Sequence, residues 1–148
     1  MLEETHIPLQ IYPGMEIFGT FDTARLLRQQ KLLTLNGSRY PLIEFAFHTD
    51  GEEETEILQT VIDAGFTPLV AHPERYSAVL DDPWIAKNWI DRGWAVQVNR
   101  DSLLGLFGQH RMACADFMME QGWVTCIVSD AHGIDGRNTD WEEAWQVL

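Results

Sequence analysis

Short apolar runs alternate with stretches of helical periodicity along this 148-residue chain. Residues 69–71 are wholly apolar and 124–128 nearly so, as expected for buried strands. Residues 52–64 instead repeat apolar side chains at the spacing of an amphipathic helix. Repeated strand and helix units predict an α/β fold, with parallel strands and outer helices. In such sheets, ligand chemistry gathers at the carboxyl ends of the strands.

The same patterns predict the course of the chain as a single domain over residues 1–148. We expect strands at 8–12, 33–35, 41–45, 67–71, 95–98 and 124–128, with a turn at Asn36-Gly37. We expect helices at 23–30, 52–64, 83–93, 102–107, 110–121 and 140–147. Asp22 is the predicted N-cap of the first helix, and Gly65 is placed to end the second.

Composition excludes several classes of protein. The formal net charge of −13 argues against a nucleic-acid binder, which needs a basic surface. No apolar stretch of about 18 residues occurs, so we expect no membrane-inserted segment, and residues 1–5 lack the pattern of a signal peptide. Cys114 and Cys126 are the only cysteines, and both fall in predicted helix or strand. Reduced thiols in a cytoplasmic protein are therefore expected.

Three polar residues follow the apolar runs closely. His72 comes directly after 69–71, while Asp130 and His132 come just after 124–128. Because side chains alternate along a strand, we expect Asp130 and His132 to point the same way. A carboxylate beside an imidazole at the carboxyl end of a strand indicates a metal site.

Together with their neighbours, these residues resemble a known family. The resemblance is to the bacterial PHP-type (polymerase and histidinol phosphatase) tyrosine-protein phosphatases of capsule and exopolysaccharide biosynthesis. It rests on Ile11-Tyr12-Pro13-Gly14-Met15-Glu16-Ile17, Leu42-Ile43-Glu44-Phe45, Ala71-His72-Pro73-Glu74-Arg75-Tyr76, Ser102-Leu103-Leu104-Gly105 before Phe107-Gly108, Ser129-Asp130-Ala131-His132 and Arg137-Asn138.

The resemblance implies a distorted (β/α)7 barrel with a multinuclear metal cluster. Manganese is the expected metal, with iron, zinc or magnesium as alternatives. By position, the metal ligands would be Glu16, Glu44, His72, Asp130 and His132, while Arg75 and Arg137 would bind phosphate. Carboxylate and imidazole suit divalent ions, and guanidinium matches phosphate oxygens. The implied reaction is phosphomonoester hydrolysis by metal-activated water, on the phosphotyrosine tail of a bacterial tyrosine kinase of polysaccharide export.

Each residue also has a purely structural interpretation. His72 would then be a buried structural histidine, Asp130 an N-cap, and Glu16 a surface residue after a turn. Arg75 would pair with Glu74 or another acid. Glu44 follows two apolar residues, and a buried carboxylate without a partner is costly, which favours a cation beside it. In the same interpretation, His132 would be a loop histidine and Arg137 a solvated arginine. His48 and His110 are expected on the surface, and the six tryptophans are expected mainly in packing.

The sequence departs from the family pattern at its beginning. The family's first strand carries a His-x-His pair, which the printed sequence lacks. We therefore expect a domain without that part and without the last carboxyl-terminal elements, weakened or inactive on its own. An interrupted barrel would expose an apolar edge, which favours a homo-oligomer. Two alternatives stay open here: a non-catalytic remnant of such a domain, or a related phosphoesterase acting on a small phosphorylated metabolite.

Overall fold

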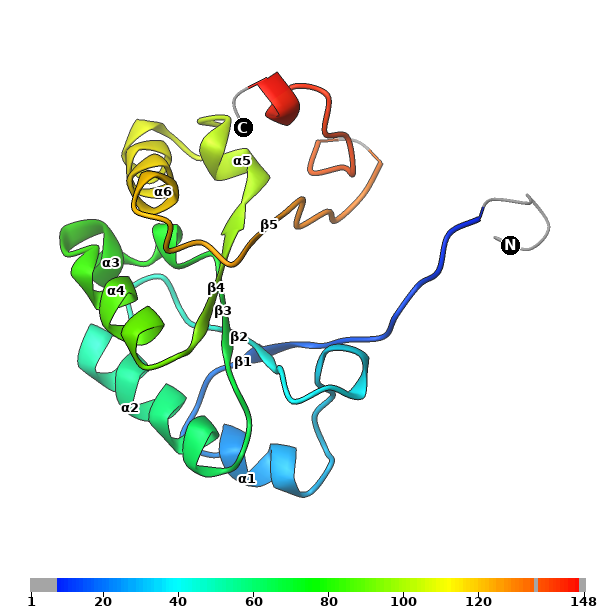
Figure 1. Ribbon diagram of the computed structural model, residues 1–148, viewed down its shortest axis with the longest axis vertical. Helices are drawn as coiled ribbons and strands as arrows, with labels where there is room; N and C mark the ends of the chain where they lie inside the picture. The colour runs from blue at the N-terminus through cyan, green and yellow to red at the C-terminus, as the bar shows by residue number, and fades with distance from the viewer. Residues whose placement is uncertain (1–7, 135, 147–148) are drawn as a thin grey trace.

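The computed structural model describes residues 8–134 and 136–146, and one parallel sheet organises them (Figure 1). Five strands pair in the order β1-β2-β3-β4-β5, so each strand lies beside its neighbours in the sequence. The strands are β1 (Glu16–Phe18), β2 (Leu42–Glu44), β3 (Leu69–Ala71), β4 (Ala95–Asn99) and β5 (Cys126–Val128). Every pairing is parallel, which confirms the predicted α/β architecture.

Helices connect the strands and follow one another along the outer side of the sheet (Figure 1). They are α1 (Thr23–Arg28), α2 (Gly51–Asp63), α3 (Ser77–Asp81), α4 (Trp84–Asp91), α5 (Arg100–Leu103) and α6 (Gln109–Glu120). Three short 3-10 helices complete the description: η1 (Leu35–Gly37), η2 (Pro73–Arg75) and η3 (Ala144–Gln146). Within residues 8–134 and 136–146, no helix combines the length and the apolar character that crossing a bilayer requires.

The two faces of the sheet differ in chemistry. The parallel register places one set of alternate residues, which includes Ile17, Ile43 and Val96, on the face that packs into the core. The other set includes Glu16 and Glu44 and is more exposed. Because successive side chains on a strand point to opposite faces, the apolar residues pack against the helices. The acidic residues therefore lie on the opposite face of the sheet.

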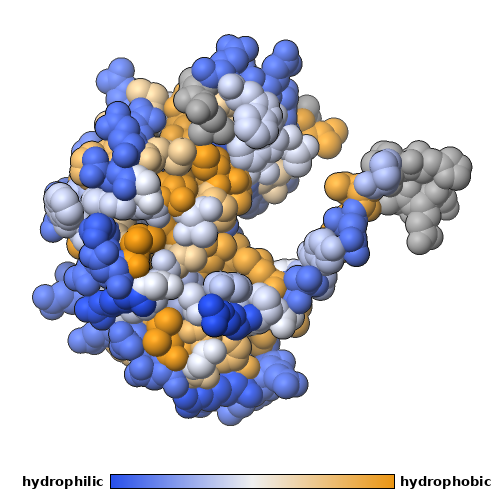
Figure 2. All heavy atoms as spheres, viewed as in Figure 1, coloured by the Kyte–Doolittle hydropathy of each residue, from blue (hydrophilic) through white to orange (hydrophobic). Residues whose placement is uncertain are grey.

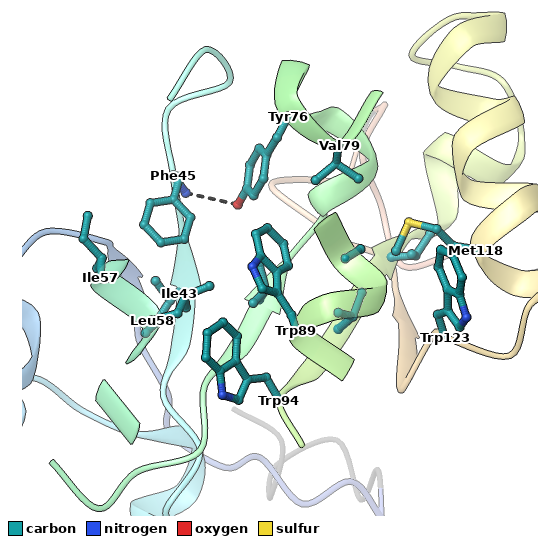
Figure 3. Close-up of a cluster of buried hydrophobic side chains, with 14 of the residues drawn as sticks. Ile43, Phe45, Ile57, Leu58, Tyr76, Val79, Trp89, Trp94, Met118 and Trp123 are labelled. Atoms are coloured by element: carbon teal, nitrogen blue, oxygen red, sulfur yellow. Dashed lines mark hydrogen bonds between the residues drawn. The ribbon is translucent and has the colours of Figure 1, made fainter. Parts of the chain in front are cut away.

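The core lies between the sheet and helices α2, α4 and α6 (Figure 3). Ile43, Leu58 and Trp89 are fully buried there, and the buried Met118 of α6 extends the cluster. Removing side chains of this size from water contributes roughly 1.5–3 kcal/mol each. Figure 2 shows the surface of the molecule in the same view as Figure 1, with hydrophilic residues around the outer rim and apolar residues toward the centre.

Most predicted elements around the core are confirmed, including four of the strands and the long helix α2. Asp50 caps α2 by accepting a hydrogen bond from the Glu52 N–H at 2.8 Å. Gly65, just beyond the helix, has φ +93°, the conformation expected of a glycine after a helix. The Asn36-Gly37 turn is also confirmed, since both residues have positive φ.

Predictions away from the core were less successful. Residues 8–12 form no strand: Leu9 and Ile11 are 61% and 70% exposed, and no neighbouring strand pairs with them among the described residues. Residues 33–35 are not a strand either, because the chain there enters η1. The predicted helix at 140–147 is reduced to η3, with residue 147 outside the described range. The predicted helix at 102–107 begins earlier, as α5, and gives way to turns before Gly105, which has φ +72°.

Two further details correct the sequence predictions. Asp22 precedes α1 but does not cap it; its carboxylate accepts a hydrogen bond from Arg25 instead. Helix α3 was not predicted, because its five residues are too few for a helical period to be recognised. The tryptophans divide: Trp89, Trp94 and Trp123 are buried, Trp141 is half-buried, and Trp84 and Trp145 are exposed.

Candidate metal centre and phosphate-binding residues

Three of the predicted metal ligands meet on the acidic face of the sheet. The Nε2 atom of His72 lies 3.5 Å from Glu16 Oε1 and 3.6 Å from Glu44 Oε2. One ligand atom from each residue falls within 4.8 Å of the other two. Glu16 begins β1, Glu44 ends β2 and His72 follows β3, so three adjacent strands supply the cluster.

The backbone around His72 explains how it reaches the carboxylates. His72 has φ 36° and ψ 51°, a left-handed conformation that turns the chain sharply at the end of β3. Such a conformation is uncommon outside glycine and carries a conformational cost. Tyr76 stabilises the turn: its hydroxyl donates to the Ala71 carbonyl at 2.7 Å and accepts from the Phe45 N–H at 3.0 Å (Figure 3). This buried hydroxyl links the ends of β2 and β3 beside the cluster.

Gly19 allows the end of β1 to approach the same place. A Cβ atom at this position would lie 2.3 Å from the Phe45 ring, which is too close for any side chain. The Gly19 N–H also donates to the Glu44 carbonyl at 2.8 Å. Glycine therefore lets the chain after β1 stay against β2, where Glu44 lies.

The two carboxylates have opposite pKa shifts. The hydrogen bond from His72 is the main cause that lowers the pKa of Glu16, against an opposing effect of burial. For Glu44, burial is the main cause that raises the pKa, and repulsion from Glu16 raises it further. Two acidic groups therefore share a place where only one is well stabilised as an anion by the protein alone.

These residues fit a divalent cation. Within residues 8–134 and 136–146, the Nδ1 atom of His72 is buried without a hydrogen-bond partner, so the protein alone does not satisfy the ring. A neutral imidazole nitrogen and two carboxylate oxygens are ligands that manganese, iron and zinc accept. A cation here would also remove the repulsion between Glu16 and Glu44. The structural interpretation of His72, a histidine satisfied by its surroundings, is not supported by this geometry.

Asp130 lies in the loop after β5, not on the strand, and has φ 47°. Its Oδ2 atom accepts a hydrogen bond from Asn99 Nδ2 at 2.8 Å and another from Arg137. Arg75 Nη1 lies 3.9 Å from the same oxygen. Asp130 is therefore the centre of a network that joins both arginines predicted to bind phosphate, and it does not belong to the cluster of Glu16, Glu44 and His72.

His132 is the most exposed of the predicted ligands, with 59% of its side chain accessible. Its Nδ1 lies 2.8 Å from the backbone oxygen of Asp130 and 3.6 Å from the carboxylate. The two side chains are thus close, but the predicted reason was wrong. Both residues follow β5 in an irregular loop, so strand alternation does not align them.

Two buried polar residues were missed by the sequence interpretation. The Oε1 atom of Glu74 accepts from the Asn99 N–H at 3.1 Å and from Ser102 Oγ at 2.6 Å. Asn99 then donates its side-chain amide to Asp130. Burial raises the pKa of the Glu74 carboxyl. Glu74 therefore does not pair with Arg75; it secures the end of β4, from which Asn99 orients Asp130. Its position inside the Pro-Glu-Arg string was the one signal available.

Other polar residues take structural positions. His48 and His110 are exposed, as predicted. Arg100 is buried and bonded to Asp101, with a further contact to the Asp140 carbonyl that ties the carboxyl-terminal segment to α5. Cys114 is buried and Cys126 half-buried, and neither forms a disulfide. Burial raises the pKa of Cys114 to about 12, so this thiol is not an activated nucleophile.

Sequence comparisons connect this site to characterised proteins. The family described as "Capsular polysaccharide synthesis, CpsB/CapC" matches residues 1–148. Tyrosine-protein phosphatase YwqE of Bacillus subtilis is 32% identical over 142 residues, which cover 96% of this chain and 56% of that protein. Tyrosine-protein phosphatase CpsB of Streptococcus pneumoniae is 31% identical over 145 residues, which cover 95% of this chain and 60% of that protein.

A structural comparison agrees with the sequences. A solved structure from work on YwqE of Bacillus subtilis and CpsB of Streptococcus pneumoniae matches with a TM-score of 0.89 and 32% identity. Those proteins are described as unique metal-dependent tyrosine phosphatases. The match covers 99% of this chain and 60% of the other. The chain therefore spans less than two thirds of the length of the relatives it matches.

Proposed function

Because the chain belongs to the CpsB/CapC family of capsular polysaccharide synthesis, we propose that it forms part of a metal-dependent protein-tyrosine phosphatase. The observation that carries this proposal is the convergence of Glu16, Glu44 and His72 within 4.8 Å of one another. Two arginines lie on the network that surrounds Asp130 beside this cluster. A cation site next to guanidinium groups is the arrangement that phosphate monoesters require.

Glu16, Glu44 and His72 would hold the first metal ion, and Asp130 and His132 would complete the metal shell. We favour manganese, with iron, zinc or magnesium as alternatives, because the donor set mixes carboxylate oxygen with imidazole nitrogen. When bound, such an ion supplies an activated water for attack on phosphorus at neutral pH. The whole protein would form the (β/α)7 barrel of its family, to which the five parallel strands described here correspond in part.

Arg75 and Arg137 would bind the non-bridging oxygens of the phosphate. Burial lowers the pKa of the Arg75 guanidinium, and repulsion from Arg137 lowers it further, so a phosphate dianion would relieve an existing cost. Asp130 lies between the two side chains and limits their separation. The residues of this chain thus orient the ester, while the protons and the attacking water depend on the metal site.

The proposed substrate is the phosphotyrosine tail of a bacterial tyrosine kinase of polysaccharide export. Both relatives compared above are tyrosine-protein phosphatases, which supports phosphotyrosine over a small phosphorylated metabolite. We also propose a cytoplasmic location, where the unpaired Cys114 and Cys126 would stay reduced.

The test is turnover by this chain of a phosphotyrosine peptide, compared with histidinol phosphate, in the presence of added manganese. We expect weak hydrolysis, confined to the peptide, because the chain spans only part of the length of its relatives. Arg75→Ala should raise the apparent KM about tenfold or more, since a charge-assisted bond to phosphate is lost, without lowering the metal content. Arg25→Ala is the matched control, because Arg25 lies on the exposed side of α1 and pairs with Asp22.

Two results would contradict the proposal. Hydrolysis of histidinol phosphate in preference to the peptide would replace the proposed substrate class. An absence of both bound metal and turnover would leave only the interpretation as a non-catalytic remnant.

A further inference from the structure

The Arg75 guanidinium has aromatic rings for neighbours. Its Cζ atom lies over the ring of Phe47 at 4.5 Å and over that of Phe107 at 4.5 Å. Phe47 comes from the loop after β2, and Phe107 from the segment between α5 and α6. Only 15% of the arginine side chain is exposed. Two segments 60 residues apart therefore converge on one cation.

The hydrogen-bond donors of this cation have few partners. Among the residues that the structure describes, Arg75 Nε is buried without any hydrogen-bond partner. The nearest carboxylate oxygen, on Asp130, is 3.9 Å from Nη1, which is too long for a hydrogen bond. Buried donors in proteins almost always have partners. Across residues 8–134 and 136–146, the guanidinium group of Arg75 is thus charged, largely covered and still free to donate.

Arg137 provides the contrast. Its Nη2 donates directly to Asp130, and its Cζ lies 5.8 Å from the Phe107 ring. Within the described residues, its Nε is buried without a partner, as that of Arg75 is, so the two arginines differ at the terminal Nη groups. A carboxylate partner occupies N–H donors, whereas the face of a ring attracts a cation without accepting those donors in the same way. The two arginines are therefore held by different means, and Arg75 keeps more donors for a ligand.

We propose that Phe47 and Phe107 are positioning residues that hold the Arg75 guanidinium ready for a phosphate monoester. The inference rests on the proposed phosphate-binding role of Arg75 and extends it to two side chains that carry no charge. Both rings act through Arg75: they stabilise its charge in a poorly hydrated place and restrict its orientation. Part of the ordering that phosphate binding requires is then present before the ligand arrives.

The arrangement can be tested without any ligand. In the metal-free chain, ring currents from faces 4.5 Å away should displace the Arg75 Nε–Hε proton resonance upfield of the other arginines. Phe47→Leu should reduce this displacement, and Phe47→Tyr, which keeps the ring, should preserve it. Phe21→Leu is the control, since Phe21 is exposed and lies over no arginine within the described part of the chain. An Arg75 resonance that Phe47→Leu leaves unmoved would overturn the proposal.

Binding of inorganic phosphate, measured by calorimetry with and without added manganese, tests the consequence. Phe47→Leu and Phe107→Leu should each weaken phosphate binding about three- to tenfold, the range expected for loss of one cation–π contact. Phe47→Tyr should restore the affinity, and Phe21→Leu should leave it unchanged. A loss that Phe47→Tyr does not restore would contradict the proposal, because it would indicate a general packing defect.

Arg75→Ala separates this inference from the proposed function. If Arg75→Ala abolishes binding but both leucine variants bind as the unaltered chain does, the positioning role is wrong and the phosphate site stands. If Arg75→Ala binds phosphate normally, the phosphate-binding role is wrong and the positioning role falls with it.

Discussion

The strand-borne cluster and the loop-borne network of this site differ in how their charges are balanced. Glu16, Glu44 and His72 come from hydrogen-bonded strands or their ends. They lie close together, and no arginine or lysine of the described residues forms an ion pair with either carboxylate. Asp130, in the loop after β5, already has Arg137 and Asn99 as partners. An acidic cluster without its own cation is the stronger candidate for binding a metal first, while the loop network is prepared for an anion.

The acidic side chains of the two regions are also held in place by different interactions. The parallel ladder sets the positions of Glu16 and Glu44, because β1 pairs with β2 over their whole length. Asp130 is held mainly by side-chain hydrogen bonds. A ladder resists displacement cooperatively, whereas side-chain bonds are lost one at a time at about 1 kcal/mol each. We therefore expect the cluster to tolerate changes in the loop better than the loop tolerates changes in the cluster.

The largest expected effect is from His72→Ala. This change removes the nitrogen ligand and leaves two carboxylates 3.5–3.6 Å from an empty position, so we expect manganese affinity to fall about 100-fold or more. Calorimetric titration of manganese into the purified chain measures it. His110→Ala is the matched control, because His110 is exposed on α6. Equal affinity for the two variants would place the metal elsewhere.

The sequence predicted the strand-borne cluster better than the loop network, because strands leave a pattern in the sequence and side-chain hydrogen bonds do not. Glu44 and His72 were placed correctly because apolar runs identify strands, and strand ends in a parallel sheet gather on one edge. Asp130 and His132 were recognised as functional candidates, but their geometry depends on a left-handed residue and on Asn99, neither of which leaves a periodic signal.

The same distinction explains the wrongly predicted strand at residues 8–12 and the missed buried acid. Residues 8–12 have a strand-like composition, yet a strand needs a partner to satisfy its backbone, and composition does not reveal the partner. Glu74 was considered only as a pairing partner of Arg75, although it is fully buried within η2. Long-range contacts decide both cases, and local sequence carries little information about them.

The next largest effect is from Glu54, a carboxyl group outside both regions. Its contribution to the pH dependence of stability has to be known before that of the two regions can be compared. Glu54 is fully buried on α2, and neither of its side-chain oxygens has a hydrogen-bond partner within residues 8–134 and 136–146. Burial raises its pKa to about 8, with smaller contributions from Asp50 and Glu53. The folded state therefore binds this proton more tightly than the unfolded state, whose ordinary value is 4.5.

The difference between the two pKa values determines how stability changes with pH. Stability should be greatest below pH 4.5 as far as this group is concerned, and should fall as pH rises toward 8, by roughly 3–5 kcal/mol in total. Glu54→Gln cannot ionise, so it should lose this slope and become the more stable protein at pH 9. Urea unfolding at pH 5 and pH 9 in the presence of a chelator measures the change. Identical slopes for both proteins would show that Glu54 is not the responsible group.

The smallest expected effect is from His132→Ala. This change tests the most exposed of the predicted ligands in the loop against the cluster of Glu16, Glu44 and His72. His132 is 59% exposed and contacts only its own loop through Nδ1, so the stability of the metal-free chain should change by less than about 0.5 kcal/mol. Manganese affinity should fall less than in His72→Ala, since the strand-borne ligands remain. Parallel titrations and urea melts of the two variants provide the measurement. A larger loss of affinity in His132→Ala would reverse the order proposed for the two regions, and would mean that the loop gathers the metal and the strands only complete its shell.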